Sequence, residues 1–555
     1  MNRFFRLVPA AFVALVIGVL VAAPPAIAQQ QQPVSDARVK ELMAQALAEV
    51  QNASQAPGTQ DTRPVVNLTL EEAVRLATEK NIDLGVQRLN PQLQDLTLKQ
   101  AKVSAYAPTY TSAFSTQRRL QQGTSTLAGG RETTTTNLNL DNSIAKNLPW
   151  YGTNFSVSWT NSRSASNSNN ASYNPNYTTT FRAQVNQPLL RNFKIDAGRQ
   201  AVLAAEISRD LADVALKGST LSTLANARNL YWDLVYAQQV VEVTRQSVAL
   251  AEKLVEDNRV RVEIGTLAPI DIVQAQAQAA AQRRSLVQAE AAVRTAELAL
   301  KRLIVSGTED PLWNSRIVPT DRPDPSMLST PPIDIEAAVR TALANRTDLV
   351  TARENLRSAE INLKYLKNQT LPGLDLGFTL SASGTGGPYL DRSGLVGPVN
   401  AIVPGGYGDA FNILRRFKYP TYNLSLNFTY PIGNSTQEAS LARARIQLQQ
   451  SQAQIRASEL RVATDVTSAA LTVQSNQQQV KAAAAALELA QKQLEAVQSR
   501  FEVGMATNYE VIQAQRDLDS AQNSQLQAIL NYVKSLVTFE LVQQTGGSAG
   551  GASGG

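Results

Sequence analysis

The strongest constraint on this chain is a long stretch that occurs twice. The first copy runs over about residues 227–303 and the second over about 466–542, and a shift of 239 positions aligns them. This shift places residues 262–265 (Val-Glu-Ile-Gly) on residues 501–504 (Phe-Glu-Val-Gly). A length of 555 residues would suggest several globular domains, but an internal repeat outweighs length as evidence of architecture. The chain is therefore not expected to consist of several unrelated domains.

Each copy predicts a long helix, a short turn at glycine and a returning helix. A seven-residue apolar repeat keeps one seam of a helix against a neighbour and is typical of coiled coils. By periodicity alone, a two-helix coiled-coil stalk is favoured over any structure with a pore. The repeat before the turn falls at Ala227, Leu234, Val241, Val248, Val255 and Val262, and again at Val466, Val473, Val480, Leu487, Leu494 and Phe501.

The composition excludes several classes of function. The chain contains no cysteine and no histidine. Disulfides and the Ser-His-Asp and Cys-His catalytic arrangements are therefore impossible, and the usual zinc and haem ligands are missing, so we expect no cofactor. The net charge of +6 is modest, and its lysines and arginines are scattered among acidic residues, which does not indicate nucleic-acid binding.

The first 28 residues read as a secretory signal peptide. Arg3 and Arg6 precede an apolar run, and Ala26-Ile27-Ala28 is an A-x-A cleavage site. The alternative, a retained membrane anchor, is disfavoured because the apolar run is shorter than a full membrane span. No later stretch approaches the length of a transmembrane helix, so we expect an exported protein without one.

The duplication covers most of the exported chain and divides it into two repeats. The second repeat opens, like the first, with a short helix, since residues 334–340 resemble residues 69–75, where Thr69 is the expected N-cap and the helix would run to about residue 105. We expect a periplasmic linker at 29–65, repeat 1 at 66–305 with helices 196–262 and 269–305, a linker at 306–332, repeat 2 at 333–543 with helices 435–502 and 508–543, and a flexible tail at 544–555.

Between the short and long helices, each repeat changes from a seven-residue to a two-residue period. We expect β-strands within 106–187 and 374–431, where apolar residues such as Leu376, Phe378 and Leu380 alternate with polar ones. Strands of about ten residues with one apolar and one polar face fit a transmembrane β-barrel. A soluble sandwich has the same period, but export and the lack of disulfides favour the outer membrane.

The first repeat also contains an additional hairpin, at about residues 134–163, with no counterpart in the second. It either extends the barrel or stands above it, and the sequence does not decide between these. Three polar segments at 121–131, 162–176 and 384–418 predict the long external loops that barrels have.

Too few strands are expected for one chain to close a barrel. The smallest membrane barrels have about eight strands. An open edge in lipid leaves unpaired backbone groups, each of which costs several kcal/mol, so the chain must oligomerise. The helices would continue the wall as a tube, and a wet lumen through both parts would make the assembly a conduit.

This order of elements resembles the TolC-like outer-membrane efflux proteins. The resemblance rests on residues 187–190 (Gln-Pro-Leu-Leu), on residues 430–434 (Tyr-Pro-Ile-Gly-Asn) and on the paired turns at 261–265 and 500–504. It implies an α+β membrane protein, a homotrimer whose barrel of about twelve strands takes about four from each chain and lies in outer-membrane lipid. A coiled-coil tunnel would extend into the periplasm of a Gram-negative-type bacterium, and an inner-membrane pump would deliver substrates through a periplasmic adaptor (membrane fusion) protein.

The resemblance also implies roles for the two turns, which would dock on the adaptor. Glycine suits a sharp turn whose backbone is exposed for close docking, and a simple helix C-cap is the alternative explanation. The residues concerned are Ile264, Gly265, Thr266, Val503, Gly504 and Met505.

A gate is implied just past the second turn, where the family narrows its tunnel with acidic residues. Glu510 matches one acidic position, Gln513 replaces the other, Ala506 stands where the family has a basic residue, and Asp271 keeps the acidic partner position. The contacts that would hold this gate closed are therefore expected to be weaker than in the family. A carboxylate favoured by the helix dipole is the alternative reading of Glu510.

We therefore expect a passive outer-membrane duct of a tripartite efflux pump or a type I secretion system, not an enzyme. Its periplasmic gate would open by an iris-like loosening of the inner helices. The alternative is a secreted coiled-coil stalk or adhesin, which explains the heptads but not alternating strands at matched places in both repeats. The sequence does not name the cargo, the pump or the adaptor.

Overall fold

A computed structural model describes residues 63–122, 132–168, 171–322, 333–394, 397–430, 432–433 and 435–546. The chain divides into two units, residues 1–64 and 65–555, and every helix and strand within these described ranges belongs to the second unit. The expected signal peptide, most of the linker at 29–65 and most of the tail lie outside the described residues.

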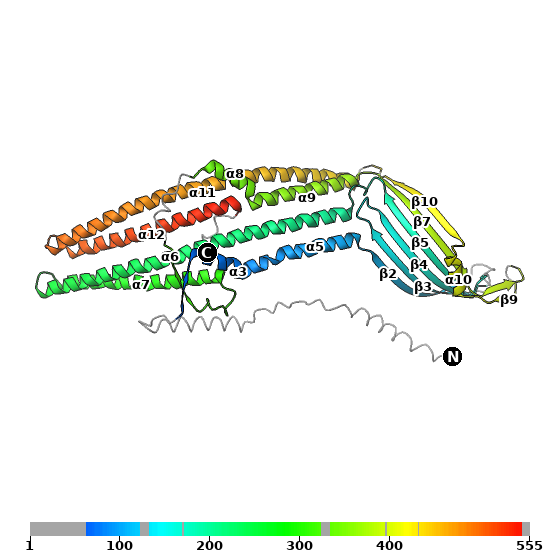
Figure 1. Ribbon diagram of the computed structural model, residues 1–555, viewed down its shortest axis with the longest axis horizontal. Helices are drawn as coiled ribbons and strands as arrows, with labels where there is room; N and C mark the ends of the chain where they lie inside the picture. The colour runs from blue at the N-terminus through cyan, green and yellow to red at the C-terminus, as the bar shows by residue number, and fades with distance from the viewer. Residues whose placement is uncertain are drawn as a thin grey trace, which may run out of the picture. The chain divides into compact units, whose positions relative to one another are not determined.

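Two long antiparallel helical hairpins are the largest elements of the second unit (Figure 1). The first joins α6 (Ala197–Glu263) to α7 (Pro269–Ile304), and the second joins α11 (Thr436–Glu502) to α12 (Asn508–Gln544). The heptad positions lie at the seams between packed helices. They are buried most deeply toward the middle of α6 and α11, away from the glycine turns. Buried seam residues include Ala227, Leu234, Val241, Val466, Val473 and Val480.

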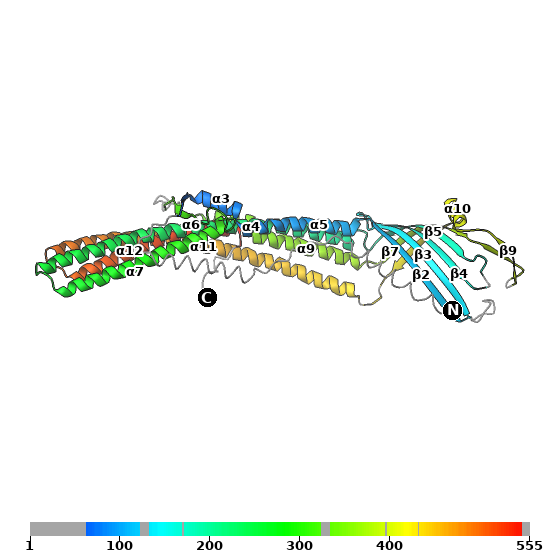
Figure 2. The same ribbon diagram turned by 90° about the horizontal axis from the view of Figure 1, so that it is seen from below.

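Shorter helices continue both hairpins toward the sheet (Figure 2). They form a row in which α5 packs on α6, α6 on α9 and α9 on α11, so that α5 and α11 are its two edges. Thr69 accepts a hydrogen bond from the Glu72 amide, which confirms it as an N-cap. The single lead helix expected over about 69–105 is wrong, because Asn81 and Arg88 divide it. The short helices are α3 (Leu70–Lys80), α4 (Ile82–Gln87), α5 (Leu89–Tyr106), α8 (Ile335–Asn345) and α9 (Thr347–Gln369).

A small belt crosses the middle of the helices. There β1 (Val65–Leu68) pairs in parallel with β6 (Arg316–Pro319), and both lie beside α6. The fully buried Tyr231 hydroxyl lies 2.8 Å from the carboxylate of Asp321 and 3.0 Å from the carbonyl of Leu68. The start of repeat 1 and the linker between repeats are thereby fixed to the midpoint of α6.

At one end of the helices lies a six-stranded antiparallel sheet with the order β10-β7-β5-β4-β3-β2. The expectation of about four strands is therefore corrected to six. The additional hairpin supplies β3 and β4, which pair along their length with β2 and β5 and so extend the sheet. The strands are β2 (Thr109–Gln122), β3 (Glu132–Asn147), β4 (Asn154–Ser166), β5 (Asn176–Pro188), β7 (Gly373–Gly386) and β10 (Pro420–Thr429).

The expected external loop at 384–418 contains regular structure. It forms a separate two-stranded sheet of β8 (Tyr389–Arg392) and β9 (Val399–Val403), followed by α10 (Tyr407–Arg415). The helix lies on the large sheet, where a Cβ atom at Gly384 would be 1.9 Å from the carbonyl oxygen of Ala410. Only glycine permits this approach.

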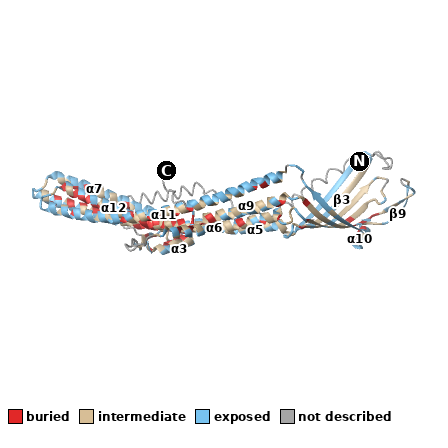
Figure 3. Ribbon diagram, turned by 90° about the horizontal axis from the view of Figure 1, so that it is seen from above, coloured by how far each residue is buried: buried red, intermediate tan, exposed pale blue. Residues whose placement is uncertain are grey.

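The described helices are long but amphipathic. Not one of the helices in the described segments combines the length and apolar character needed to cross a membrane. Figure 3 shows buried residues concentrated where helices pack together, whereas α11 near the sheet is mostly exposed. Between Ala444 and Val462, α11 has no buried residue.

Candidate docking turns and gate

The two helical turns lie at the end of the hairpins far from the sheet and have nearly the same backbone. Gly265 has φ +80° and Gly504 has φ +79°, a region in which other residues are strained. In each turn the glycine N–H reaches back three residues, and the next N–H reaches back five, to the carbonyl of Arg261 or of Arg500. This is the Schellman arrangement, so the expected C-cap role of both glycines is present.

The turns also expose apolar side chains. Ile264 is 68% exposed, Val503 70% and Met505 67%. A Cβ atom at either glycine would meet nothing within 4 Å, so both glycines face open space within the protomer. Exposed apolar groups at an open tip are typical of a surface that binds another protein. Thr266 uses its backbone N–H and its hydroxyl to cap the carbonyl of Arg261.

Glu510 lies in the first turn of α12 and is held by local contacts. Thr507 is the N-cap, accepting from the Glu510 amide at 3.3 Å and donating to the Glu510 carboxylate at 3.2 Å. Arg500 lies 4.0 Å from the same carboxylate, and both side chains are more than one-third exposed. The dipole-favoured role of Glu510 is therefore present, and its carboxylate still faces solvent.

Gln513 and Asp271 occupy the same level of the helices. Gln513 is exposed and donates to Asp517 at 2.9 Å, one turn further along α12. Asp271 lies in the first turn of α7, and its carbonyl accepts from Asn258 at 3.4 Å and from Asn508 at 3.2 Å. The structure thus brings Asp271 next to the start of α12 through its backbone.

Sequence reasoning missed a buried amide pair that joins the two hairpins. Asn258 on α6 is fully buried and donates to the side chain of Asn508 on α12 at 2.9 Å. A buried asparagine at a seam position is a known means of fixing the register of a coiled coil. The signal was present, because Asn258 follows Ala251 and Leu254 at the spacing of seam residues.

A second missed group lies further along α12. The carboxylate of Asp519 accepts hydrogen bonds from Ser247 on α6 and from Gln282 on α7, the latter at 2.6 Å. Burial raises the pKa of Asp519 above its ordinary value despite these two bonds. One turn earlier, Arg516 donates to Gln278 of α7 at 3.0 and 2.8 Å.

The bases of the turns are also joined directly. Arg261 donates to the carbonyl of Phe501 at 2.9 Å, and its guanidinium lies 4.4 Å from the centre of the Phe501 ring. Together, these contacts make a polar interface between the two hairpins near their tips. The part of the chain that the structure describes has no cluster of three or more acidic residues arranged to hold a metal ion.

Comparison with known sequences places this architecture in a family. Residues 153–305 and 338–546, more than half of the chain, match the family described as outer membrane efflux protein. The chain belongs to this family. Outer membrane efflux protein BepC of Brucella suis biovar 1 (strain 1330) is 24% identical over 371 residues, which are 66% of this chain and 72% of BepC.

Solved structures share the fold. The outer membrane channel CmeC of Campylobacter jejuni has a TM-score of 0.60 at 15% identity, covering 86% of this chain and 85% of CmeC. CusC has a TM-score of 0.62 at 15% identity, and the alignment covers 89% of this chain and 96% of CusC. The outer membrane channel MtrE of Neisseria gonorrhoeae, in its open state, has a TM-score of 0.56 at 16% identity. The alignment covers 86% of this chain and 89% of MtrE.

The family membership confirms the resemblance and the localisation expected from the sequence, and the fold class of a β-barrel continued by a helical tunnel. This outer-membrane efflux protein has its helical part in the periplasm, and its family consists of passive channels rather than enzymes. No comparison supports the secreted stalk or adhesin. The match in repeat 1 begins at Thr153, directly before β4, so β2 and β3 precede it.

Proposed function

We propose that three copies of this chain form a continuous duct from the periplasm through the outer membrane. The observation that carries this proposal is that both lateral edges of the protomer are unfinished along their whole length. One edge consists of α7, α5 and β2, and the other of α11 and β10. A protomer with two complementary open edges closes into a ring when each edge meets the opposite edge of the next copy.

Exposed apolar residues support this arrangement. On α5, Leu93 and Leu96 are 56% and 62% exposed, and on α11, Leu460 is 71% exposed. Every residue of β2 is exposed, and β10 likewise has an unpaired edge. In lipid an unpaired strand edge costs several kcal/mol per backbone group, so neighbouring copies must pair β2 with β10.

The tips of the tube would receive a periplasmic adaptor, which links the duct to an inner-membrane pump or a type I secretion exporter. The exposed Ile264, Val503 and Met505 supply apolar contacts, while the glycine turns keep the backbone accessible. The duct itself performs no chemistry in this proposal, and its energy comes from the inner-membrane partner.

The gate would lie where α12 leaves the second turn. Glu510 and Gln513 line it, with Asp271 behind them. The interface of Asn258, Asn508 and Asp519 holds α12 against the first hairpin. Loosening of this interface lets α12 move outward in each copy and widens the entrance.

The docking role is tested by substitution in cells that depend on the chain for efflux. Val503→Asp places a charge in the apolar contact, and we expect it to abolish resistance to exported compounds while the protein still reaches the outer membrane. Gln246→Asp is the matched control, because Gln246 is exposed on α6, which lies between α7 and α12, about 27 Å from the turn. Full resistance with Val503→Asp would remove the turn from the docking surface.

The gate role of Glu510 is tested in planar bilayers. Glu510→Gln removes three carboxylates from a trimeric entrance, so we expect a higher conductance or a lower preference for cations. Gln513→Glu should have the opposite effect on selectivity. Unchanged values for both variants would exclude this level of α12 from the gate.

A further inference from the structure

The additional hairpin adds two strands, β3 and β4, to the four expected in each chain. We infer that the membrane barrel of this protein contains eighteen strands, six from each of three copies, and is therefore much wider than a barrel of four-stranded protomers. The inference rests on the proposed trimer and adds to it the width of the exit and the place of the narrowest point.

The first argument is that β3 and β4 stand in the wall itself. They lie between β2 and β5, and removing them would leave the sheet in two pieces. Pairing is continuous, from Thr109 opposite Ala145 to Gln122 opposite Glu132, and from Asn154 opposite Asn186 to Ser164 opposite Asn176. A hairpin standing above the barrel would instead leave β2 paired directly with β5.

The second argument is that one apolar band crosses all six strands. Side chains paired across the sheet share a face. One row of paired residues consists of Tyr110, Ile144, Val157, Ala183, Leu380 and Tyr422, one from each strand. The opposite face carries polar residues such as Ser143, Ser158 and Thr379. The hairpin therefore has the same apolar-out and polar-in pattern as the other strands.

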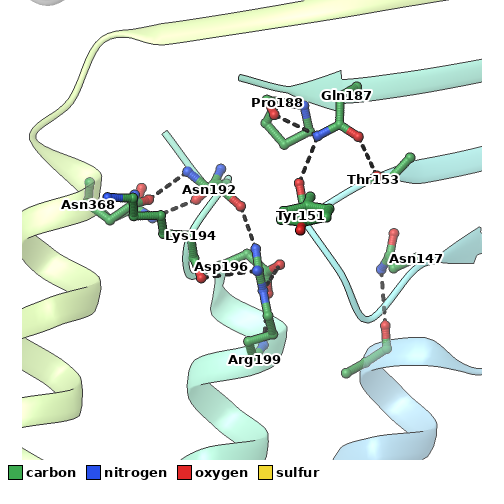
Figure 4. Close-up of polar contacts among 12 residues, drawn as sticks. Asn147, Tyr151, Thr153, Gln187, Pro188, Asn192, Lys194, Asp196, Arg199 and Asn368 are labelled. Carbon is green, nitrogen blue, oxygen red and sulfur yellow. Dashed lines mark hydrogen bonds and ion pairs between the residues drawn. The ribbon is translucent and has the colours of Figure 1, made fainter. Parts of the chain in front are cut away.

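The third argument is that the hairpin is fastened at the periplasmic end of the sheet (Figure 4). Gln187 of β5 accepts from Thr153 and donates to the carbonyl of Tyr151 at 2.9 Å. The Tyr151 ring stacks on Phe193 at 4.8 Å between ring centres. The hairpin turn is thus held against the segment that leads from β5 into α6.

Glycine makes this fastening possible. Gly152 has φ +68°, and a Cβ atom there would lie 2.5 Å from the carbonyl oxygen of Asn192. That carbonyl accepts from Arg199 at 2.6 Å, and Asn192 also accepts from Gln369 at the end of α9. The hairpin turn, the start of α6 and the end of α9 therefore form one junction between sheet and helices.

The width depends on the number of strands. With strands ~4.8 Å apart and tilted by about 40°, a closed barrel of eighteen strands is about 36 Å across between opposite strands, and one of twelve is about 24 Å. Barrels of about this size enclose an aqueous channel. The sheet therefore does not limit the size of the cargo, which leaves the proposed gate at the periplasmic end as the point that would.

Adjacent residues of β4 provide a test, which the absence of native cysteine makes clean. Single variants Ser158→Cys and Val157→Cys are placed in outer-membrane vesicles and treated with a membrane-impermeant, water-soluble thiosulfonate. We expect Ser158→Cys to react from the lumen and Val157→Cys to react at least about tenfold more slowly, because lipid shields it. Comparable rates would place the hairpin in water and overturn the inference.

Electron microscopy of the detergent-extracted protein separates this inference from the proposed function. A ring of three copies with eighteen strands supports both. A trimer with a twelve-stranded barrel and the hairpin outside it would overturn the inference and leave the duct intact. A monomeric particle would instead contradict the proposed duct.

Discussion

The two helical tips are built on nearly the same backbone and differ in how they are attached. Both turns have a glycine in the left-handed region and the same pair of backbone hydrogen bonds. After the first turn, α7 begins with Ala268 and Pro269 and has no side-chain cap. After the second, α12 begins with Thr507, whose hydroxyl caps the helix and holds Glu510. The repeated residues thus give both tips the same turn geometry. The residues that follow each turn determine whether the tip has a capped helix with a carboxylate held beside it.

The returning helices differ further along. Whereas α7 packs chiefly on α6, α12 packs on its own partner α11 and also on α6. It presents Asn508 and Asp519 to the first hairpin, and both make hydrogen bonds across the interface. These hydrogen bonds would have to break for α12 to move away from the first hairpin. In the proposed gate, α12 is therefore the helix that would move and the first hairpin would be its support.

The largest effect is expected from Asp519→Ala. The change removes the bonds to Ser247 and Gln282, and hydrogen bonds to a charged group contribute about 1.5–3 kcal/mol each. We expect α12 to separate more readily and the conductance in planar bilayers to rise by about fivefold or more. Asp519→Asn is the control, since it can keep the bonding, and should stay near the wild-type value. Wild-type conductance with alanine would mean that α12 is held elsewhere.

The pH dependence of the conductance tests the same role of Asp519. The pKa of Asp519 is raised by burial above 3.8, so the folded interface binds a proton more readily than the separated one. The interface is therefore strengthened as the pH falls through the raised pKa and weakened as the pH rises through it. We expect conductance to decrease at acidic pH, and the decrease to disappear in Asp519→Asn. An identical pH profile in that variant would assign the effect to another group.

The amide pair should make a smaller contribution. Asn258→Leu leaves Asn508 without its buried side-chain partner, and an unsatisfied buried polar group costs about 1–3 kcal/mol. We expect a lower melting temperature for the detergent-extracted protein, with a similar loss for Asn508→Leu. The double leucine variant should recover part of the stability, because both polar groups are then absent. Additive losses would show that the two residues do not act as a pair.

The two glycines should give the smallest effects and the most direct comparison. Gly265→Ala and Gly504→Ala each force a residue with a Cβ atom into the left-handed region, at a cost of about 1 kcal/mol. Because neither site has a neighbour within 4 Å, we expect equal and small decreases in melting temperature. A clearly larger decrease for Gly504→Ala would mean that the second turn also supports the packing of α12.

Much of this fold could be predicted from the sequence, because its signals are periodic. The heptads of α6 and α11, the glycine turns and the alternation in β7 and β10 each arise from local rules. The alternation of the additional hairpin was visible at Leu138, Leu140, Val157 and Trp159, but the strand count could not be predicted, since alternation does not show which strands pair. Likewise, α10 interrupts a Gly-rich segment that reads as a loop, and only its packing over Gly384 shows its place.

The candidate site was less predictable than the fold. The turn residues could be found because they repeat. By contrast, Asp519 and Gln282 lie far apart in the sequence, and no periodic rule joins them. The partners of Glu510, Thr507 and Arg500, are local and obey ordinary capping rules. Contacts between elements distant in the chain required the three-dimensional structure.

The belt at the middle of the helices gives these movements a pivot. Tyr231 anchors α6 to β1 and to the carboxylate of Asp321. From Tyr231 to the tip at Ile264 the helix extends about 50 Å. Leu530 and Val533 of α12 pack into the same belt. In the proposed gate, a rotation of α12 by a few degrees about this level would move its start, about 33 Å away at Asn508, by a few ångströms relative to the tip of α6.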